Sequence, residues 1–356
     1  MLKRIEFIPN KANSLLLALL LVAPALNAQQ SGSEGERQGA GSLATQSGSP
    51  AGGELLRPPL LIAAQAEGSG EPQAEDRAPA YWLNKMAEAV TSLEYRGLVT
   101  FEHVGMLETL EVVRGIRGGE LVERVRYLSG TSRELVSRGH DAHCRREGSP
   151  LSRAGIWSRS GQENVQALYH VLLRGDERVA DRDAVVLELR PKDVHRLGMV
   201  VSVDRQTGLP LKSLLVNANG QILERYQFVQ LDLSPVSDKD LAAHTDSARE
   251  TDTMAACGSI VSRWQVRWIP PGFKAVAARE VENGEMLVYS DGLSVFTVFI
   301  QMLGPEMNFN GRAVRGATVA YMDHVLEGEQ RYTITVVGEI PVQTAQLVAR
   351  AIAAKN

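Results

Sequence analysis

Few residues of this chain have the type and spacing that chemistry needs, and the first candidates lie near position 140. The segment His140-Asp141-Ala142-His143-Cys144 brings three kinds of zinc ligand close together in the sequence. Zinc requires three or four ligands that converge on one point. In an extended segment, His140 and Cys144 lie on one face and Asp141 and His143 on the other, so the set is split. A metallohydrolase that uses His140 and His143 is therefore an alternative that needs ligands from elsewhere.

A second candidate is Ser290, which directly precedes Asp291 and Gly292. A serine beside a carboxylate can suggest a nucleophile, but no histidine lies nearby, and Asp before Gly is typical of a turn. The chain also contains no Gly-x-Ser-x-Gly elbow, no phosphate-binding Gly-rich loop and no His-Glu-x-x-His motif. We therefore expect a binding protein without catalytic residues, bound metal or cofactor.

Composition limits the classes of partner. The chain has 356 residues, enough for two domains, and a formal net charge of -4. No overall basic field points to nucleic acid, which we exclude as a partner. Arginine and glutamate side chains cluster between residues 102 and 146, which is typical of a solvated sheet face of mixed charge. A subset of these arginines near a cavity mouth is an alternative site for lipid phosphates or an acidic peptide.

The N-terminus has the features of a secretory signal. Lys3, Arg4 and Lys11 precede an apolar core at residues 15–22, which is too short to span a membrane. We predict a signal peptide over residues 1–28 and export to the bacterial periplasm, with an uncleaved anchor as the alternative. An oxidising compartment permits a disulfide between the two cysteines, Cys144 and Cys257, although the sequence does not show that they approach each other.

Residues 29–78 are rich in Gly, Ser, Gln, Glu and Pro without periodicity, which predicts a disordered linker. Order is expected from residue 79, with a first helix that places Trp82, Met86 and Val90 on one face. A second helix is expected over residues 163–173. Alternating patterns and turn residues predict strands near 98–104, 107–115, 121–128, 133–138, 184–190, 197–204, 209–216 and 221–231.

These strands form a long antiparallel meander over residues 79–233, and such a sheet must cover one apolar face. A curled, unclosed sheet over its own helices, with room for an apolar ligand, is one solution, and an ordinary filled core is the other. Residues 234–262 are polar and are expected to be a linker or a partly ordered crossover. A second domain over residues 263–356 combines several strands with a final helix that begins near Pro341.

Several motifs in the chain match one known family in order and spacing. The C-terminal part reads Trp268-Ile269-Pro270-Pro271-Gly272-Phe273 and, further on, Tyr289-Ser290-Asp291-Gly292-Leu293-Ser294-Val295-Phe296. The N-terminal part carries Leu93-Glu94-Tyr95-Arg96-Gly97, Pro191-Lys192-Asp193 and Asp204-Arg205-Gln206-Thr207-Gly208-Leu209-Pro210. From about residue 82 to 353 the chain resembles the MucB/RseB family of periplasmic negative regulators of envelope-stress sigma factors of the sigma-E/AlgU type.

The resemblance implies an α+β fold: a LolA/LolB-like unclosed antiparallel β-barrel over helices, followed by a smaller C-terminal α/β domain. It also implies that the protein binds the periplasmic region of a transmembrane anti-sigma factor of the RseA/MucA type. Such binding shields the anti-sigma factor from site-1 proteolysis, and lipid or lipopolysaccharide binding triggers release. The alternative is a periplasmic lipoprotein or lipid carrier of the LolA/LolB type, and homo-oligomerisation is left open.

Two sets of candidate site residues follow. The first set would line a lipid cavity, chosen by strand alternation or helical phase, with plain core packing as the alternative: Val99, Phe101, Leu110, Val112, Leu168 and Leu172. The second set would contact the anti-sigma factor, because the family motifs lie there: Trp268, Phe273, Ser290, Asp291, Phe296 and Phe299. The alternative for the second set is that the Pro-Pro-Gly and Ser-Asp-Gly turns only shape their domain.

Overall fold

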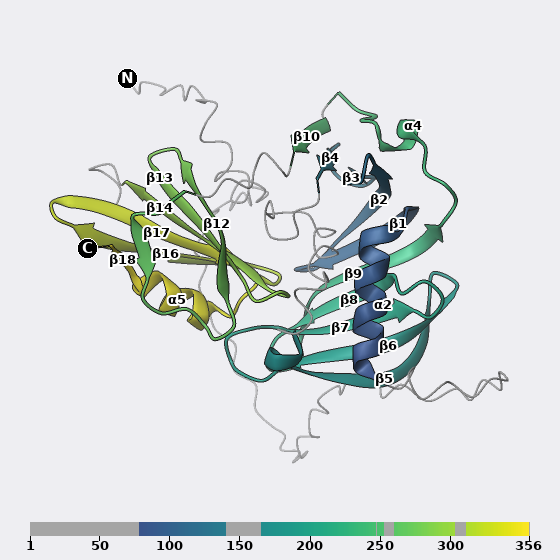
Figure 1. The fold of residues 1–356 in the computed structure, drawn as a ribbon, viewed down its shortest axis with the longest axis horizontal. Helices are drawn as coiled ribbons and strands as arrows, with labels where there is room; N and C mark the ends of the chain where they lie inside the picture. The colour runs from purple at the N-terminus through teal and green to yellow at the C-terminus, as the bar shows by residue number, and fades with distance from the viewer. Residues whose placement is uncertain (1–77, 140–164, 247, 253–259, 303–310, 356) are drawn as a thin grey trace, which may run out of the picture. The chain divides into compact units, whose positions relative to one another are not determined.

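The computed structural model of the protein describes two β-sheets and the helices packed against them (Figure 1). Both sheets belong to one compact unit that spans Gly68–Asn356. The residues that the structure describes are 78–139, 165–246, 248–252, 260–302 and 311–355.

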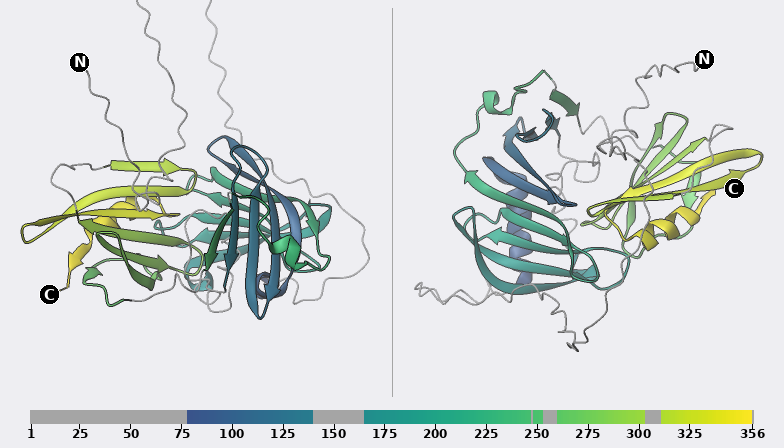
Figure 2. Two further views of the ribbon diagram at one scale, coloured as in Figure 1. Left: turned by 90° about the horizontal axis from the view of Figure 1, so that it is seen from above. Right: turned by 180° about the vertical axis from the view of Figure 1, so that it is seen from behind.

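Helix α2, Pro79–Ser92, is the first described element. Its buried side chains recur every three or four positions and include Trp82, Met86 and Val90, so a single apolar face meets the sheet. Figures 1 and 2 agree that α2 runs across one face of the larger sheet. The helix ends where Leu93 becomes extended and its N–H donates to the carbonyl oxygen of Ala89. The first predicted helix is thus confirmed.

The larger sheet has ten strands in the order β10-β4-β3-β2-β1-β9-β8-β7-β6-β5. Neighbouring strands pair antiparallel, except that β10 runs parallel to β4. The two edge strands, β10 and β5, do not pair with each other, so the sheet is unclosed. The strands are β1 (Tyr95–His103), β2 (Met106–Arg117), β3 (Glu120–Tyr127), β4 (Glu134–Arg138), β5 (Tyr169–Val179), β6 (Arg182–Pro191), β7 (Gly198–Asp204), β8 (Pro210–Val216), β9 (Ile222–Asp232) and β10 (Ala248–Asp252).

Alternation along these strands supplies an apolar inner face. Val99 on β1 and Leu110 and Val112 on β2 are fully buried, and they form one cluster with Tyr226 and Phe228 of β9. A second cluster joins the apolar face of α2 to alternate residues of β6 and β7. The expected unclosed antiparallel sheet over few helices is therefore confirmed, as is the α+β class.

The turn between β7 and β8 contains the motif Asp204-Arg205-Gln206-Thr207-Gly208, whose Asp and Gly are residue types typical of turns. The carboxylate of Asp204 accepts hydrogen bonds from the Thr207 amide at 2.8 Å and from Arg182 on β6 at 2.9 Å. Gly208 has φ +82°, and a Cβ there would lie 2.6 Å from the carbonyl oxygen of Lys85 on α2. Only glycine satisfies both the conformation and the close approach of the helix.

The smaller sheet has the order β12-β13-β14-β17-β16-β15, with all pairs antiparallel. Helix α5, Val342–Arg350, packs against β16 and β17 (Figure 1). A separate two-stranded ribbon pairs β11, Trp264–Val266, with β18, Ile352–Ala354. The sheet strands are β12 (Lys274–Val281), β13 (Gly284–Ser290), β14 (Val295–Met302), β15 (Gly311–Arg315), β16 (Thr318–Glu327) and β17 (Gln330–Gly338).

The second helix expected over residues 163–173 is wrong in its larger part. Helical residues are described only at 165–168, and the chain is extended from Tyr169 onward as β5. The apolar residues Val165, Leu168 and Leu172 fit a helical period, but Tyr169, Val171 and Leu173 fit an alternating one equally well. Pairing with β6, which a local pattern does not reveal, decides between them.

A buried carboxylate binds the described part of the crossover over residues 234–262. It contains helix α4, Asp238–Leu241, and strand β10. Glu134 of β4 accepts hydrogen bonds from the amides of His244 and Thr245 and from the guanidinium of Arg124. Burial alone would raise the pKa of Glu134, but these hydrogen bonds hold it below its ordinary value.

Candidate functional site

Three of the motifs that carry the family resemblance meet at one place, which we call the joint. It consists of the loop 192–197 between β6 and β7, the turn 270–273 and the turn 290–294. The loop belongs to the larger sheet and the two turns belong to the smaller one. Hydrogen bonds within the compact unit connect all three segments.

Arg196 lies at the centre of the joint. Its guanidinium donates to Asp291 Oδ2 at 2.6 Å and to the Pro271 carbonyl oxygen at 2.6 Å. A second ion pair joins it to Asp193 at 2.9 Å, within its own loop. The side chains of Arg196 and Asp291 are both 0% exposed. Although burial opposes the positive charge, Asp193 and Asp291 hold the pKa of Arg196 above its ordinary value, so the residue stays charged.

Asp291 organises the Ser-Asp-Gly turn while it receives Arg196. Its Oδ1 accepts the amides of Leu293 at 2.8 Å and Ser294 at 2.7 Å, and Tyr169 donates its hydroxyl to Oδ2 at 3.3 Å. Burial raises the pKa of Asp291, and the two amides together with Arg196 counteract this in part. Every partner that the carboxylate needs in a buried site is therefore supplied by the surrounding fold.

The Pro-Pro-Gly turn delivers an aromatic side chain into the core of the smaller sheet. The Phe273 amide donates to the Pro270 carbonyl oxygen at 3.2 Å, and Gly272 has φ +83°. A Cβ on Gly272 would lie 2.5 Å from Leu168, so the turn packs tightly on the segment before β5. The Phe273 ring lies 5.0 Å from the Phe296 ring, centroid to centroid. This arrangement agrees with the rigid turn expected from the sequence.

One side of the joint is open to solvent. His195 Nδ1 lies 3.2 Å from Thr344 Oγ1 on α5, and its ring packs edge-on against Trp268 with centroids 5.2 Å apart. Trp268 is 36% exposed and Val194 is 78% exposed. Exposed tryptophan side chains are enriched at protein-binding surfaces.

A further contact joins the two sheets through β9 and the turn between β15 and β16. Glu224 accepts the Ala317 amide at 3.0 Å. A Cβ on Gly316, which has φ +60°, would lie 2.8 Å from Glu224 Oε1. The two sheets therefore meet through backbone turns at more than one point.

The structure divides the predicted anti-sigma contacts into two groups. Phe273, Asp291 and Phe296 are buried, so in this conformation they shape the turns from within. Trp268 is exposed, and Ser290 and Phe299 are partly buried, so these three retain surface that a partner can reach. The assignment of all six as contacts stays a prediction.

The predicted lipid-cavity residues are divided in a similar way. Val99, Leu110 and Val112 are fully buried, and the partly buried Phe101 packs on the same cluster. Leu168 and Leu172 are partly buried near β5, and Leu172 belongs to that strand and not to a helix. Leu168 packs against the cluster that contains the apolar face of α2, so all of these side chains except Leu172 contribute to core packing, and the lipid role stays a prediction.

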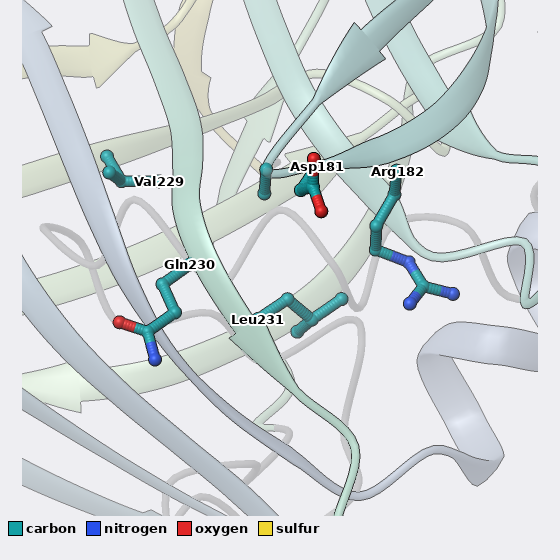
Figure 3. A pocket seen from close by; sticks show the side chains of 6 residues that line it. Asp181, Arg182, Val229, Gln230 and Leu231 are labelled. Atoms are coloured by element: carbon teal, nitrogen blue, oxygen red, sulfur yellow. The ribbon is translucent and has the colours of Figure 1, made fainter.

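A hollow of about 330 Å³ lies where the β5–β6 turn approaches β9 (Figure 3). Its lining mixes polar and apolar side chains, and the lining includes none of the six cavity candidates. The lining residues are Ala180, Asp181, Arg182, Val229, Gln230 and Leu231. The turn has φ +51° at Ala180 and +63° at Asp181, which folds it back sharply.

Other sequence candidates fall on different parts of the chain. His140, His143, Cys144 and Cys257 lie outside the described residues. Among the residues that are described, no group of three potential ligands could hold a metal ion. Within those same ranges, no helix has the length and hydropathy needed to cross a membrane.

Arg196 was not among the predicted site residues. A lone arginine in a polar loop resembles a solvated surface residue, and its main partner lies 95 positions away. The nearest available signal was the matching motif Pro191-Lys192-Asp193, at the start of the loop. That motif marks the location without identifying the residue.

Comparison with known proteins places the whole folded unit in one family. The model of the MucB/RseB N-terminal domain matches residues 78–245, and the model of the MucB/RseB C-terminal domain matches residues 259–353. The two matches together include the joint, the smaller sheet and every strand of the larger sheet except β10.

Individual relatives agree. The chain is 34% identical over 282 residues to the sigma factor AlgU regulatory protein MucB of Pseudomonas aeruginosa, covering 76% of this chain and 89% of that protein. It is 23% identical over 293 residues to the sigma-E factor regulatory protein RseB of Escherichia coli K12, covering 75% and 88%. The solved complex of Pseudomonas aeruginosa MucA and MucB aligns with a TM-score of 0.64 and 32% identity, covering 78% of this chain and 99% of that chain. The chain therefore belongs to the MucB/RseB family.

Proposed function

We propose that this protein binds the periplasmic region of a transmembrane anti-sigma factor of the RseA/MucA type and shields it from site-1 proteolysis. One observation carries the proposal: the similarity to MucB in its complexes with MucA extends over 78% of this chain and over almost all of the relative. Both sheets of the fold are thus preserved relative to a protein that was solved together with this kind of partner. The bacterial periplasm is the compartment in which such binding would occur.

The exposed side of the joint is the place where we propose direct contact. Trp268 offers a large amphipathic side chain there, with Ser290 as a second contact, and Phe299 on β14 is a further contact outside the joint. Phe273, Asp291 and Phe296 act from within, because they set the shape of the turns on which the exposed residues lie. Tryptophan is prominent among residues whose truncation costs a protein interface most of its affinity.

We also propose that lipid or lipopolysaccharide triggers release of the anti-sigma factor. A lipid that entered the larger sheet would have to separate side chains such as Val99, Leu110 and Phe101 from the cluster that they now fill. A ligand that favours this opened state weakens the binding of any partner that favours the closed one, and the reverse holds equally. The proposal therefore predicts mutual competition between lipid and anti-sigma factor.

Titration calorimetry tests the binding proposal directly. The purified protein is titrated with the periplasmic region of the anti-sigma factor from the same organism. Trp268→Ala should weaken binding at least about ten-fold, whereas Leu326→Ala, an exposed apolar residue on β16, should leave affinity unchanged. Absence of binding by the wild-type protein would overturn the proposal. If the tagged protein isolated from the periplasm carries lipid but no anti-sigma factor, the lipid carrier is favoured instead.

A further inference from the structure

We propose that Arg196 is the positioning residue through which the larger sheet fixes the partner-binding turns of the smaller sheet. The inference rests on the proposed function, because it assigns a cause to the shape of that binding surface. It concerns a residue that does not itself reach the exposed side of the joint.

The first step of the argument is the origin of the contacts. Arg196 comes from the loop that follows β6, while Asp291 and Pro271 come from two different turns of the smaller sheet. One guanidinium therefore binds both turns at once, at 2.6 Å in each case. The planar fork of arginine, with several donors in fixed directions, allows this, and lysine's single ammonium does not reproduce it.

The second step is the burial of the charges. Both side chains of the Arg196–Asp291 pair are fully buried, and a buried charge without its partner is strongly unfavourable. The pair is intact only when the loop and the turns hold this relative position. Buried ion pairs contribute little to net stability, but they restrict the relative positions that the paired segments can take. Here the paired segments belong to two different sheets.

The third step connects Arg196 to the exposed surface. Trp268 lies three positions before Pro271, whose carbonyl oxygen Arg196 binds, and its ring packs on His195, the neighbour of Arg196. Ser290 directly precedes Asp291. Loss of the guanidinium therefore frees Pro271 and Asp291, which lie close in sequence to Trp268 and Ser290. The side chains of Trp268 and Ser290, which would contact the partner, are themselves unchanged.

The test compares two arginine variants. Arg196→Met removes the charge between the sheets, and Arg182→Met removes the bidentate pair with Asp204, which lies within the larger sheet alone. Two quantities are measured for each: affinity for the anti-sigma periplasmic region by calorimetry, and hydrogen exchange of the Leu293 and Ser294 amides. These amides donate to Asp291 and report directly on the order of its turn.

We expect Arg196→Met to weaken binding at least about ten-fold and to accelerate exchange of both amides, while Arg182→Met changes neither. Arg196→Lys should restore part of the affinity. Tyr169→Phe, which removes the 3.3 Å hydrogen bond to Asp291 and the interaction of the same hydroxyl with Ser294 but leaves Arg196 in place, should fold normally and show a smaller change in the same direction. Wild-type affinity and wild-type exchange in Arg196→Met would overturn the inference.

Failure of the proposed function gives a different result. If the wild-type protein does not bind the anti-sigma region, the calorimetric comparison reports on the function and not on Arg196. The exchange measurement then still decides whether Arg196 holds the turn: accelerated exchange supports a positioning role, and unchanged exchange rejects it.

Discussion

The turn between β1 and β2 contains a valine in a conformation that valine rarely adopts. Val104 has φ +48° and Gly105 has φ +71°, and the flanking residues His103 and Met106 pair across the ladder. A two-residue hairpin loop with positive φ at both positions is a type I′ turn, in which Asn-Gly is the favoured pair. We predict that Val104→Asn stabilises the protein.

The expected magnitude follows from the backbone and from exposure. A non-glycine residue in the left-handed region costs about 1–2 kcal/mol, and asparagine recovers part of this through local hydrogen bonds. The Val104 side chain is 61% exposed, so little packing is lost when it is replaced. The free energy of unfolding should rise by about 1 kcal/mol, which for a unit of this size corresponds to a melting temperature about 2 °C higher.

Differential scanning calorimetry of the full chain measures this shift. Leu107→Asn is the matched control: Leu107 is 65% exposed in the same hairpin but belongs to the extended strand β2, so its replacement should not stabilise. The reverse change, Asn283→Val, places valine where φ is +59° and should lower the melting temperature. The reasoning for the β1–β2 turn would be refuted if Asn283→Val lowers the melting temperature but Val104→Asn leaves it unchanged or lowers it.

Two further predictions concern other turns. Burial alone would raise the pKa of Asp204, but hydrogen bonds, first from Arg182, hold it below the ordinary 3.8. The carboxylate therefore stabilises the fold above about pH 4, and this contribution disappears as the pH falls through the lowered pKa. In urea unfolding, the difference in free energy of unfolding between wild type and Asp204→Asn should be smaller at pH 3 than at pH 6. Gly272→Ala should lower stability by about 2 kcal/mol or more in the same assay, because the new Cβ collides with Leu168 in addition to its backbone strain. Gly105→Ala, which meets open space at a similar φ, should cost less, and equal losses would contradict the role of the collision.

Much of the fold could be predicted because its signals are local. Alternating residues predicted nearly all strands of the larger sheet, and the Asp291 turn was predicted from residues whose conformational preferences require no distant partner. Strand β5 was missed because a short apolar run fits two periods, and β10 because its ordering depends on Glu134, more than 100 positions earlier. Local pattern therefore predicts elements well where side chains near in sequence decide the structure.

The turns that carry the candidate site could be predicted from the sequence, but their packing could not, and their role as contacts stays a prediction. The family motifs correctly indicated the turns at 270–273 and 290–294, but no sequence pattern shows that Asp291 is buried against an arginine from another sheet. Phe273 and Phe296 are buried whereas Trp268 is exposed, although all three belong to the motifs that carry the resemblance. Such distinctions depend on tertiary packing, which becomes visible only when the two sheets are seen together.

The two-stranded ribbon of β11 and β18 has a mechanical consequence. Trp264 pairs with Ala354, and the Lys355 amide donates to the Arg263 carbonyl oxygen at 2.8 Å, so the chain enters and leaves the smaller sheet domain at the same end of one ladder. A pulling force applied at Arg263 and Lys355 loads the hydrogen bonds of the ribbon one after another, as in unzipping, and not all together, as in shear. The ribbon would therefore separate before the six-stranded sheet, and the Trp264 ring would leave its edge-on contact with Tyr332 as the first event of forced unfolding.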